Sequence, residues 1–243
     1  VYSRSLCFLL CKAAEDVFPQ SKMEVKHPIS NGYFCDLHKA DASAITAGDV
    51  QKIKERMQEI IDRNVPFHRR EVRLEEAIEI SRREGNDNNL RLLETSAQPY
   101  VDYYMLGDTV DYYYGRLLPS AGYIQVWDII PYHNGILLRV PDRYNPSVLP
   151  PFVDQPKTFE VFSEDLKWNR IMNLRNAGDV NHVCLEGGAS DLIQISEALQ
   201  EKKLVQIAEE IERRYNDPVS PVRIVLITGP SSSGKTTVTR PPS

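Results

Sequence analysis

Residues 100–115, YVDYYMLGDTVDYYYG, decide the fold that the sequence predicts. Tyrosine and β-branched residues crowd this stretch, and Gly107 and Gly115 interrupt it. Aromatic and β-branched side chains favour strands, and glycines mark the turns between them. The same composition continues through residues 124–130 and 136–140. This region therefore predicts antiparallel strands, whose tyrosines fill a sheet face or line a pocket.

Upstream of the tyrosine-rich region, helical and extended patterns alternate. Asn31-Gly32 is a hairpin turn signal inside an extended segment. Thr46 followed by Asp49 resembles a capping box at the start of a helix that ends before Pro66. The predicted elements are helices at 5–18, 46–64 and 74–84, a hairpin at 25–37 and a short strand at 67–72.

Downstream, the prolines between residues 141 and 156 indicate a boundary or a stiff linker. Beyond it we expect a helix at 163–175, a loop at 177–189 and a long amphipathic helix at 190–215. The apolar run VRIVLIT at 222–228 is typical of a buried parallel strand. A lone strand exposes two unpaired edges, so we expect it to be disordered or to pair elsewhere.

Composition and charge limit the classes of function. The 243 residues carry 29 Lys and Arg against 34 Asp and Glu, a formal net charge of -5. This balance argues against a general nucleic-acid binder, although a local basic patch is compatible with it. The sequence shows no apolar run long enough for a membrane span and no secretory signal. Four cysteines without a CxxC pair predict reduced thiols in a cytoplasmic protein, and Cys35 with His38 alone makes no zinc site.

The strongest motif follows the apolar run. Residues 229–236 read GPSSSGKT, a match to GxxxxGK[ST]. Glycines let the backbone approach phosphate oxygens, and successive N–H groups at a helix N-terminus attract anions. We expect Lys235 to act on the β- and γ-phosphates as the catalytic residue, and Thr236 to bind Mg²⁺. The predicted binding residues for ATP are Gly229, Ser231, Ser232, Ser233, Gly234, Lys235, Thr236 and Thr237.

A first resemblance covers the C-terminal part. SEALQEKKLVQIAEEIERRY at 196–215, followed by VRIVLITGPSSSGKTT, resembles the junction into the kinase domain of bacterial uridine kinase-like nucleoside kinases. It implies phosphoryl transfer from ATP to the 5′-hydroxyl of a uridine- or cytidine-like nucleoside. The chain starts without methionine and ends seven residues after Thr236, and Pro241-Pro242 cannot continue a helix. We therefore expect a piece of a longer protein, inactive in catalysis by itself.

A second resemblance covers the N-terminal part. PISNGYFCD at 28–36 and the helix and strand at 49–72 resemble the second additional domain of threonyl-tRNA synthetases, and VDYYYG at 110–115 resembles the region of its editing motif. In that family an HxxxH pair and a CxxxH pair hydrolyse mischarged tRNA. The matching positions are Arg4 and Phe8 for the first pair and Tyr113 and Leu117 for the second. Because none is His or Cys, the resemblance implies a binding or structural element without that chemistry.

Three functions stay open at this point. The first is the N-terminal portion of an ATP-dependent nucleoside kinase, with a nucleotide and a nucleoside as partners. The second is a module that binds tRNA or an aminoacyl end, and the third is a regulatory or oligomerisation domain. Local basic charge would serve the second function, and the residues that supply it are His68, Arg69, Arg70, Arg73, Arg82 and Arg83. A homo-oligomer also stays open.

The predicted fold class is α+β. An antiparallel, tyrosine-rich sheet is packed by the early helices, a helical connector follows, and the first strand and P-loop of an α/β kinase domain come last. The predicted domains are a synthetase-like domain over 1–145, a linker and connector over 146–216, and the start of the kinase domain over 217–243.

Overall fold

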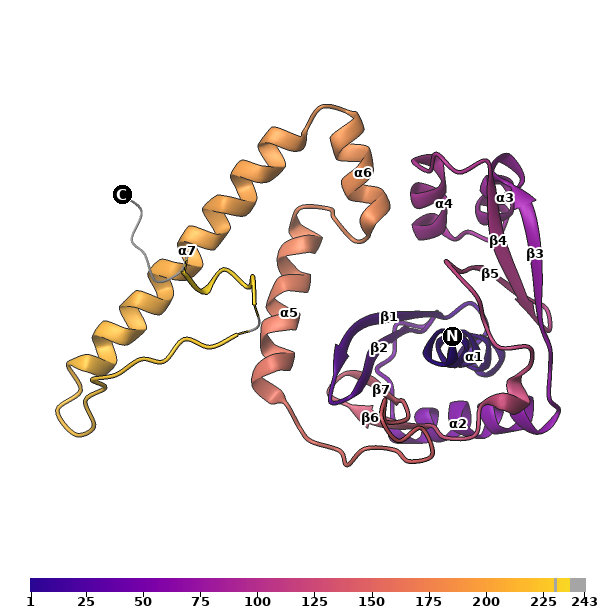
Figure 1. Ribbon diagram of the computed structural model, residues 1–243, viewed down its shortest axis with the longest axis horizontal. Helices are drawn as coiled ribbons and strands as arrows, with labels where there is room; N and C mark the ends of the chain where they lie inside the picture. The colour runs from indigo at the N-terminus through magenta and orange to yellow at the C-terminus, as the bar shows by residue number, and fades with distance from the viewer. Residues whose placement is uncertain (230, 237–243) are drawn as a thin grey trace. The chain divides into compact units, whose positions relative to one another are not determined.

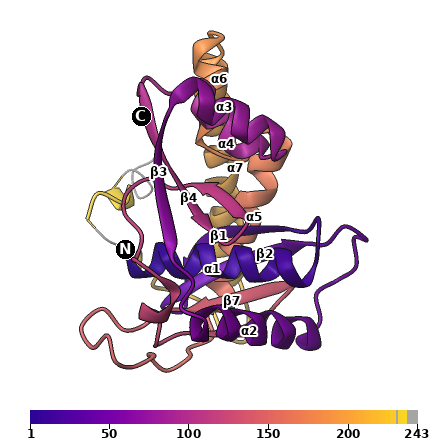
Figure 2. The same cartoon turned by 90° about the vertical axis from the view of Figure 1, so that its right-hand side faces the viewer.

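The computed structural model describes residues 1–229 and 231–236 (Figures 1 and 2). It divides into two units, Val1–Asp179 and Val180–Ser243. The first unit holds both sheets. In chain order the elements are α1 (Tyr2–Val17), β1 (Lys22–Ile29), β2 (Gly32–His38), α2 (Ala47–Asp62), β3 (Phe67–Arg73), α3 (Leu74–Arg83), α4 (Asp87–Glu94), β4 (Tyr100–Leu106), β5 (Thr109–Tyr112), η1 (Ala121–Tyr123), β6 (Asp128–Tyr132), β7 (Gly135–Arg139), α5 (Pro156–Ile171), α6 (Ala177–Leu185) and α7 (Ala189–Tyr215).

Helix α1 lies at the centre of the core of the first unit, between the two sheets and beside α2 (Figure 1). It is buried around most of its circumference, and Leu6, Phe8 and Leu10, which point in different directions, are all fully buried. They share one apolar cluster with Met57 of α2 and Leu106 of β4. Since α1 touches both sheets and α2, it positions the residues of the first unit's candidate site.

The first sheet has the strand order β1-β2-β7-β6 and is antiparallel. Ser30 and Asn31 form the turn between β1 and β2 with φ of 50° and 57°, which confirms the hairpin predicted there. A Cβ atom on Gly32 would lie 2.3 Å from the Leu138 carbonyl oxygen, so only glycine fits where β2 meets β7. The face away from α1 is covered by Phe159 of α5.

The second sheet has the order β3-β4-β5 and is also antiparallel. Helices α3 and α4 cover one of its faces (Figure 2), where Tyr103 is buried and donates a hydrogen bond to the Ala77 carbonyl oxygen at 3.1 Å. Tyr104 is buried on the other face, against the cluster that contains α1. These positions confirm the antiparallel strands and show that tyrosines fill sheet faces.

The capping box predicted for α2 is confirmed. The Asp49 backbone N–H donates to Thr46 Oγ1 at 3.2 Å, and the Thr46 N–H donates to Asp49 Oδ2 at 2.9 Å. Lys39 Nζ also lies 2.6 Å from Asp49 Oδ2. A hydrogen bond from Lys39 lowers the pKa of Asp49 to about 2. This cap fixes where α2 begins and ties it to the chain after β2.

Three predictions about the second half of the chain are wrong or incomplete. The expected loop at 177–189 contains helix α6, and the expected helix at 163–175 begins earlier, at Pro156. Residues 222–228 form no strand; the Val222 N–H instead donates to the Arg214 carbonyl oxygen at 3.0 Å. An apolar run becomes a strand only beside a partner strand, and none lies next to it in the described part of the second unit.

The antiparallel α+β architecture is confirmed, whereas the α/β kinase part of the predicted fold has no support. No helix among residues 1–229 and 231–236 is both long and apolar enough to cross a membrane. All four cysteines are free thiols. The predicted domain boundaries stay predictions, and Thr237, Pro241 and Pro242 lie outside the described residues.

Candidate functional site

The four positions that match the editing residues of the synthetase family come from two places in the chain. Arg4 and Phe8 lie one turn apart on α1, and Tyr113 and Leu117 lie on the loop after β5. The structure brings these places together: the ring centroids of Phe8 and Tyr113 are 5.1 Å apart. Leu117 is buried, and its N–H donates to the Tyr104 hydroxyl at 3.4 Å.

Aromatic rings fill the centre of this site. Phe8 is fully buried and also lies 6.0 Å from the ring of Phe67. Tyr113 meets Tyr104 edge-on, with the ring centroids 6.5 Å apart. Such tilted and edge-on pairs stabilise one another beyond the area that they bury. The centre of the site therefore consists of packed apolar side chains.

Arg4 fastens the loop after β5 to α1. Its guanidinium donates to the Tyr114 carbonyl oxygen at 3.1 Å and to the Arg116 carbonyl oxygen at 3.3 Å. Gly115, between them, has a φ of +90°, and a Cβ atom there would lie 3.0 Å from Arg4 Nη1. The Arg4 side chain thus binds the backbone of the loop and leaves the side chains of Tyr114 and Arg116 exposed.

Burial controls the titratable groups around the rings. It raises the pKa of the Cys7 thiol to about 12, and it raises the pKa of Cys11 and of Tyr113 well above their ordinary values. Burial also raises the pKa of Asp111, although hydrogen bonds from the Asn89 side chain and the Tyr112 N–H oppose the shift. The two thiols and the phenol are therefore protonated at neutral pH, so none of them supplies an anionic nucleophile.

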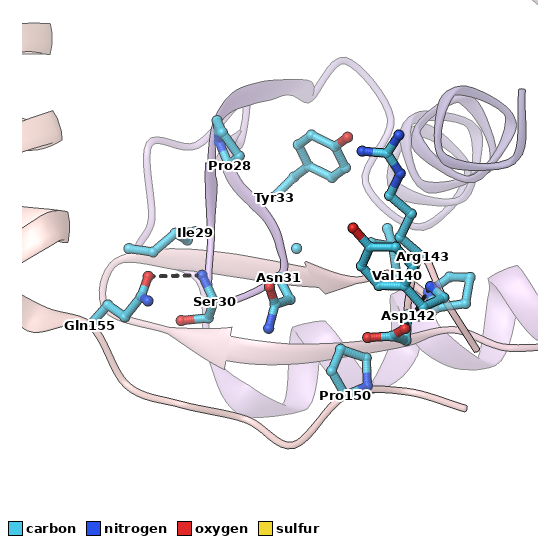
Figure 3. A pocket seen from close by; sticks show the side chains of 13 residues that line it. Pro28, Ile29, Ser30, Asn31, Tyr33, Val140, Asp142, Arg143, Pro150 and Gln155 are labelled. Atoms are coloured by element: carbon cyan, nitrogen blue, oxygen red, sulfur yellow. Dashed lines mark hydrogen bonds between the residues drawn. The ribbon is translucent and has the colours of Figure 1, made fainter. Parts of the chain in front are cut away.

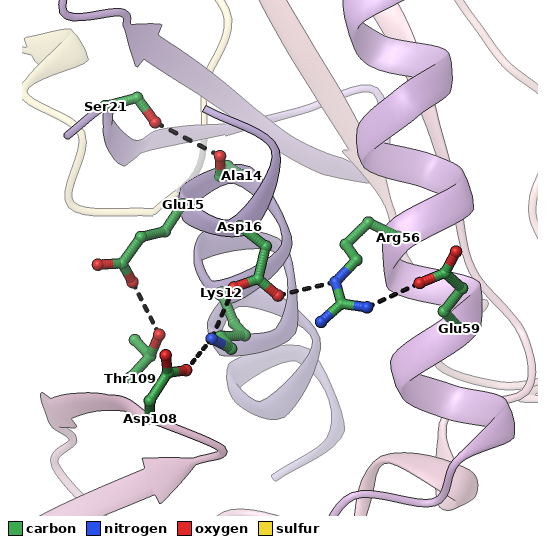
Figure 4. Close-up of polar contacts among 9 residues, drawn as sticks. All are labelled: Lys12, Ala14, Glu15, Asp16, Ser21, Arg56, Glu59, Asp108 and Thr109. Carbon is green, nitrogen blue, oxygen red and sulfur yellow. Dashed lines mark hydrogen bonds and ion pairs between the residues drawn. The ribbon is translucent and has the colours of Figure 1, made fainter. Parts of the chain in front are cut away.

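A chain of ion pairs joins α1 to its neighbours (Figure 4). Lys12 is buried and forms ion pairs with Asp16, at 2.7 Å, and with Asp108 in the turn between β4 and β5. Asp16 in turn lies 2.8 Å from Arg56 of α2. Burial by itself would lower the pKa of Lys12, but hydrogen bonds to Asp108 and Asp16 outweigh it and raise that pKa. This network holds α1 against α2 and the second sheet.

The predicted basic residues lie on β3 and α3, and carboxylates partner most of them. Arg69 lies 2.8 Å from Asp102, and Arg70 lies 2.6 Å from Glu76. The weaker pairs, near 3.6 Å, are those of Arg82 with Glu94 and of Arg83 with Glu84. This part of the chain is therefore a mixed-charge surface, on which His68 and Arg73 are also exposed.

A cavity of about 480 Å³ lies elsewhere in the first unit, where the β1–β2 turn faces the chain after β7 (Figure 3). Sequence reasoning missed it. The hairpin signal and the prolines marked its two walls separately, but no local pattern indicated that they converge. The residues that supply its polar and aromatic side chains are Ser30, Asn31, Tyr33, Asp142, Arg143, Tyr144 and Gln155.

The predicted phosphate loop lies in the second unit. Ser232 and Gly234 have φ of 60° and 76°, so the backbone turns sharply between Ser231 and Lys235. Lys235 Nζ donates to the Gly229 carbonyl oxygen at 2.9 Å and to Ser233 Oγ at 3.3 Å. Of the residues predicted to bind phosphate, those from Gly229 to Thr236 are brought together in one curled loop, and Thr237 lies outside the described residues.

Comparison with known proteins shows which resemblance holds. No family model matches the chain. Over 130 residues it is 32% identical to a threonine–tRNA ligase of Syntrophotalea carbinolica, a match that covers 53% of this chain and 20% of the ligase. Similar matches occur with threonine–tRNA ligases of Streptococcus suis, at 32% identity, and Thermoplasma volcanium, at 28%, each covering 54% of this chain. The chain thus matches about a fifth of the length of these relatives.

These matches correct the functional prediction. The relatives are threonine–tRNA ligases over about half of the chain, so identifying it as part of a uridine kinase-like nucleoside kinase is wrong. The kinase, transferase and ATP-binding assignments and the nucleoside substrate have no support. The likeness to a synthetase domain is what the comparisons support.

Proposed function

We propose that the synthetase-like part of the chain is a tRNA-binding module that does not hydrolyse aminoacyl-tRNA. One observation carries this proposal: the four positions of the editing motifs converge on one place, but Phe8 and Tyr113 fill it with packed rings. The relatives' name gives tRNA as what they act on. The four positions meet in the folded chain but carry no His or Cys, which supports binding of tRNA rather than hydrolysis of aminoacyl-tRNA.

Hydrolysis of an ester needs a placed water and a base that can accept a proton. At these positions Phe8 is fully buried and Leu117 is nearly so, and neither side chain has an atom that could accept a proton or hold a water by a hydrogen bond. The nearby thiols Cys7 and Cys11 stay protonated because burial raises their pKa. Arg4 donates to two carbonyl oxygens and cannot act as a base.

The outer surface of the same site offers groups that suit RNA. Tyr114 is 75% exposed, and Arg116 beside it is exposed as well. Arginine binds phosphate oxygens through paired N–H groups, and tyrosine stacks on unpaired bases. The net charge of the chain is -5, so RNA contact would depend on such local groups rather than on the whole surface.

The test is binding of labelled tRNA to the full chain, measured by fluorescence anisotropy at several salt concentrations. We expect binding that weakens with salt, and Arg116→Gln should weaken it and reduce the salt slope by about one. Arg116→Lys is the matched control, because it keeps the charge and should retain most of the affinity.

A parallel assay with mischarged aminoacyl-tRNA should show no release of the amino acid above the uncatalysed rate. Release that depends on the protein, or the absence of salt-sensitive tRNA binding, would contradict the proposed function.

A second function is favoured by the curled loop of the second unit. We infer that the loop of residues 229 and 231–236 binds phosphate groups. Lys235 Nζ donates to the Gly229 carbonyl oxygen and to Ser233 Oγ, so the positive charge of Lys235 is held inside the curled loop, where it would attract a phosphate. Thr236 would hold Mg²⁺ that accompanies a bound phosphate chain, where the ion would neutralise its charge. ATP with Mg²⁺ stays an untested prediction for this loop.

Inorganic triphosphate tests the loop without assuming a nucleotide. Calorimetric titration with and without Mg²⁺ should give binding that Lys235→Ala weakens at least tenfold. Lys202→Ala, on α7, is the control of equal charge change. Equal affinity of both variants and the unchanged chain would refute the loop as a phosphate site.

A further inference from the structure

We propose that the cavity between the β1–β2 turn and the chain after β7 binds one unpaired ribonucleotide at the single-stranded end of an RNA. This inference rests on the proposed tRNA-binding function and adds a site for it. The cavity lies apart from the four editing-like positions, which belong to α1 and the loop after β5.

The size and the rings of the cavity fit a nucleotide. Its volume of about 480 Å³ falls within the usual range of sites for small ligands. Tyr33 of β2 forms part of the wall and is half-buried, whereas Tyr144 is 92% exposed. Tyrosine rings stack on any base, because every base has a π-face. The two rings that line this cavity, one exposed and one half-buried, offer two such surfaces.

The polar groups are arranged for a base and a phosphate. Figure 3 shows Arg143, from the chain after β7, and Tyr33, from β2, among the side chains that line the cavity. The Arg143 guanidinium can bind a phosphate through paired N–H groups. Asp142 Oδ1 already accepts from the Tyr144 and Asn145 N–H groups, at 2.7 and 2.8 Å. Its other carboxylate oxygen remains an acceptor for a base amino group.

Hydrogen bonds hold the walls in place before any ligand binds. The Ser30 hydroxyl donates to the Val153 carbonyl oxygen at 2.6 Å, and the Ser30 N–H donates to Gln155 Oε1 at 3.2 Å. Arg139 Nη2 donates to the Pro150 carbonyl oxygen at 2.5 Å. A site whose walls are already fixed loses little conformational entropy on binding. These contacts therefore favour a built site over a chance hollow.

The experiment compares two RNA hairpins that differ only in a four-nucleotide 3′ overhang. Anisotropy with the full chain should show tighter binding to the hairpin with the overhang. Tyr144→Ala should weaken binding of the overhang hairpin about tenfold and leave the blunt hairpin unaffected, because stacking contributes about that much per base. Tyr144→Phe should retain the preference, since it keeps the ring.

Arg143→Gln should also reduce the preference for the overhang. The matched control for Tyr144→Ala is Tyr123→Ala. Tyr123 is 61% exposed and does not line the cavity, so its loss should change neither affinity.

If Tyr144→Ala and Arg143→Gln leave the preference intact, the site is refuted while RNA binding stands. If the unchanged chain binds neither hairpin nor tRNA, the proposed function fails instead. Competition by an acidic peptide but not by a mononucleotide would assign the cavity to a protein partner and overturn the inference.

Discussion

The ring of Phe8 lies 5.1 Å from the ring of Tyr113, at an angle of 42°. This contact joins the N-terminal half of α1 to the loop after β5, two segments that are more than 100 residues apart in the sequence. The resemblance described above matches both residues to editing positions of the synthetase family, and in this structure the two side chains pack against each other. Its contribution should therefore appear in stability.

We expect Phe8→Ala to lower the free energy of unfolding of the first unit by about 3–5 kcal/mol, because it leaves a cavity where a fully buried ring was. Phe8→Leu should lower it less, since most of the volume is kept. Urea unfolding followed by circular dichroism measures both. Tyr114→Ala is the control, because that ring is 75% exposed. A Phe8→Ala loss no larger than that of the control would show that the rings do not hold the site together.

The ion pairs of Lys12 predict unequal effects for its two carboxylate partners. Asp16 is half-buried and also binds Arg56, whereas the Asp108 side chain is 88% exposed. Asp16→Ala should lower the free energy of unfolding by about 2–4 kcal/mol. Without Asp16, the buried Lys12 keeps the solvent-exposed Asp108 as its ion-pair partner. Asp108→Ala should lower it by less than about 1 kcal/mol. Denaturant midpoints at pH 7 compare them, and equal losses would contradict this account.

Local sequence signals sufficed where the determining atoms are close in the chain. Thr46 and Asp49 predicted the start of α2, and the hairpin signal at Asn31 predicted the β1–β2 turn, because caps and turns depend on a few adjacent residues. The start of α6 has a cap of the same kind, which was not predicted from the sequence. The Asp179 N–H donates to Asn176 Oδ1 at 3.1 Å, and the Asn176 N–H donates to Asp179 Oδ2 at 3.2 Å.

Contacts between distant segments could not be predicted from the sequence. The resemblance pointed to Arg4 and Leu117 as members of one site, but not to the two carbonyl oxygens that Arg4 would bind. Nor could it show that the chain after β7 would close a cavity on the β1–β2 turn. The prediction of a strand at 222–228 was wrong for the same reason, since an apolar segment forms a strand only when another strand pairs with it.

The four thiols should react at very different rates. Cys35 is buried and Cys184 is exposed, and burial raises the pKa of Cys7 to about 12 and of Cys11 and Cys35 well above their ordinary values. Reaction with Ellman's reagent at pH 8 should therefore show one fast thiol and slow release of the others, because the thiolate is the reactive form. Cys184→Ser should remove the fast phase, and Cys7→Ser should leave it unchanged. Two or more fast thiols in the folded chain would contradict the raised pKa of the other three cysteines.

The imidazole of His27 is buried beneath α5 with no hydrogen-bond partner for either ring nitrogen. It stacks on Phe162 of α5, with ring centroids 4.2 Å apart, and lies 5.3 Å from the ring of Phe34. Burial, and then the charge of Lys26, lowers the pKa of His27 below its ordinary 6.5. Packing of α5 on the first sheet therefore favours the neutral form of this ring.

The unfolded chain takes up a proton at His27 more readily than the folded one. The contribution of His27 to the free energy of unfolding should therefore be fully present above pH 6.5 and decrease as the pH drops below it. Urea unfolding at pH 7.5 and pH 5.5, followed by tryptophan fluorescence, measures the loss; Trp168 lies on α5. In His27→Phe the loss between the two pH values should shrink, because the ring stays apolar and cannot titrate. His68→Gln removes an exposed histidine and should leave the loss unchanged. An equal loss in His27→Phe and the unchanged chain would show that other groups cause the acid sensitivity.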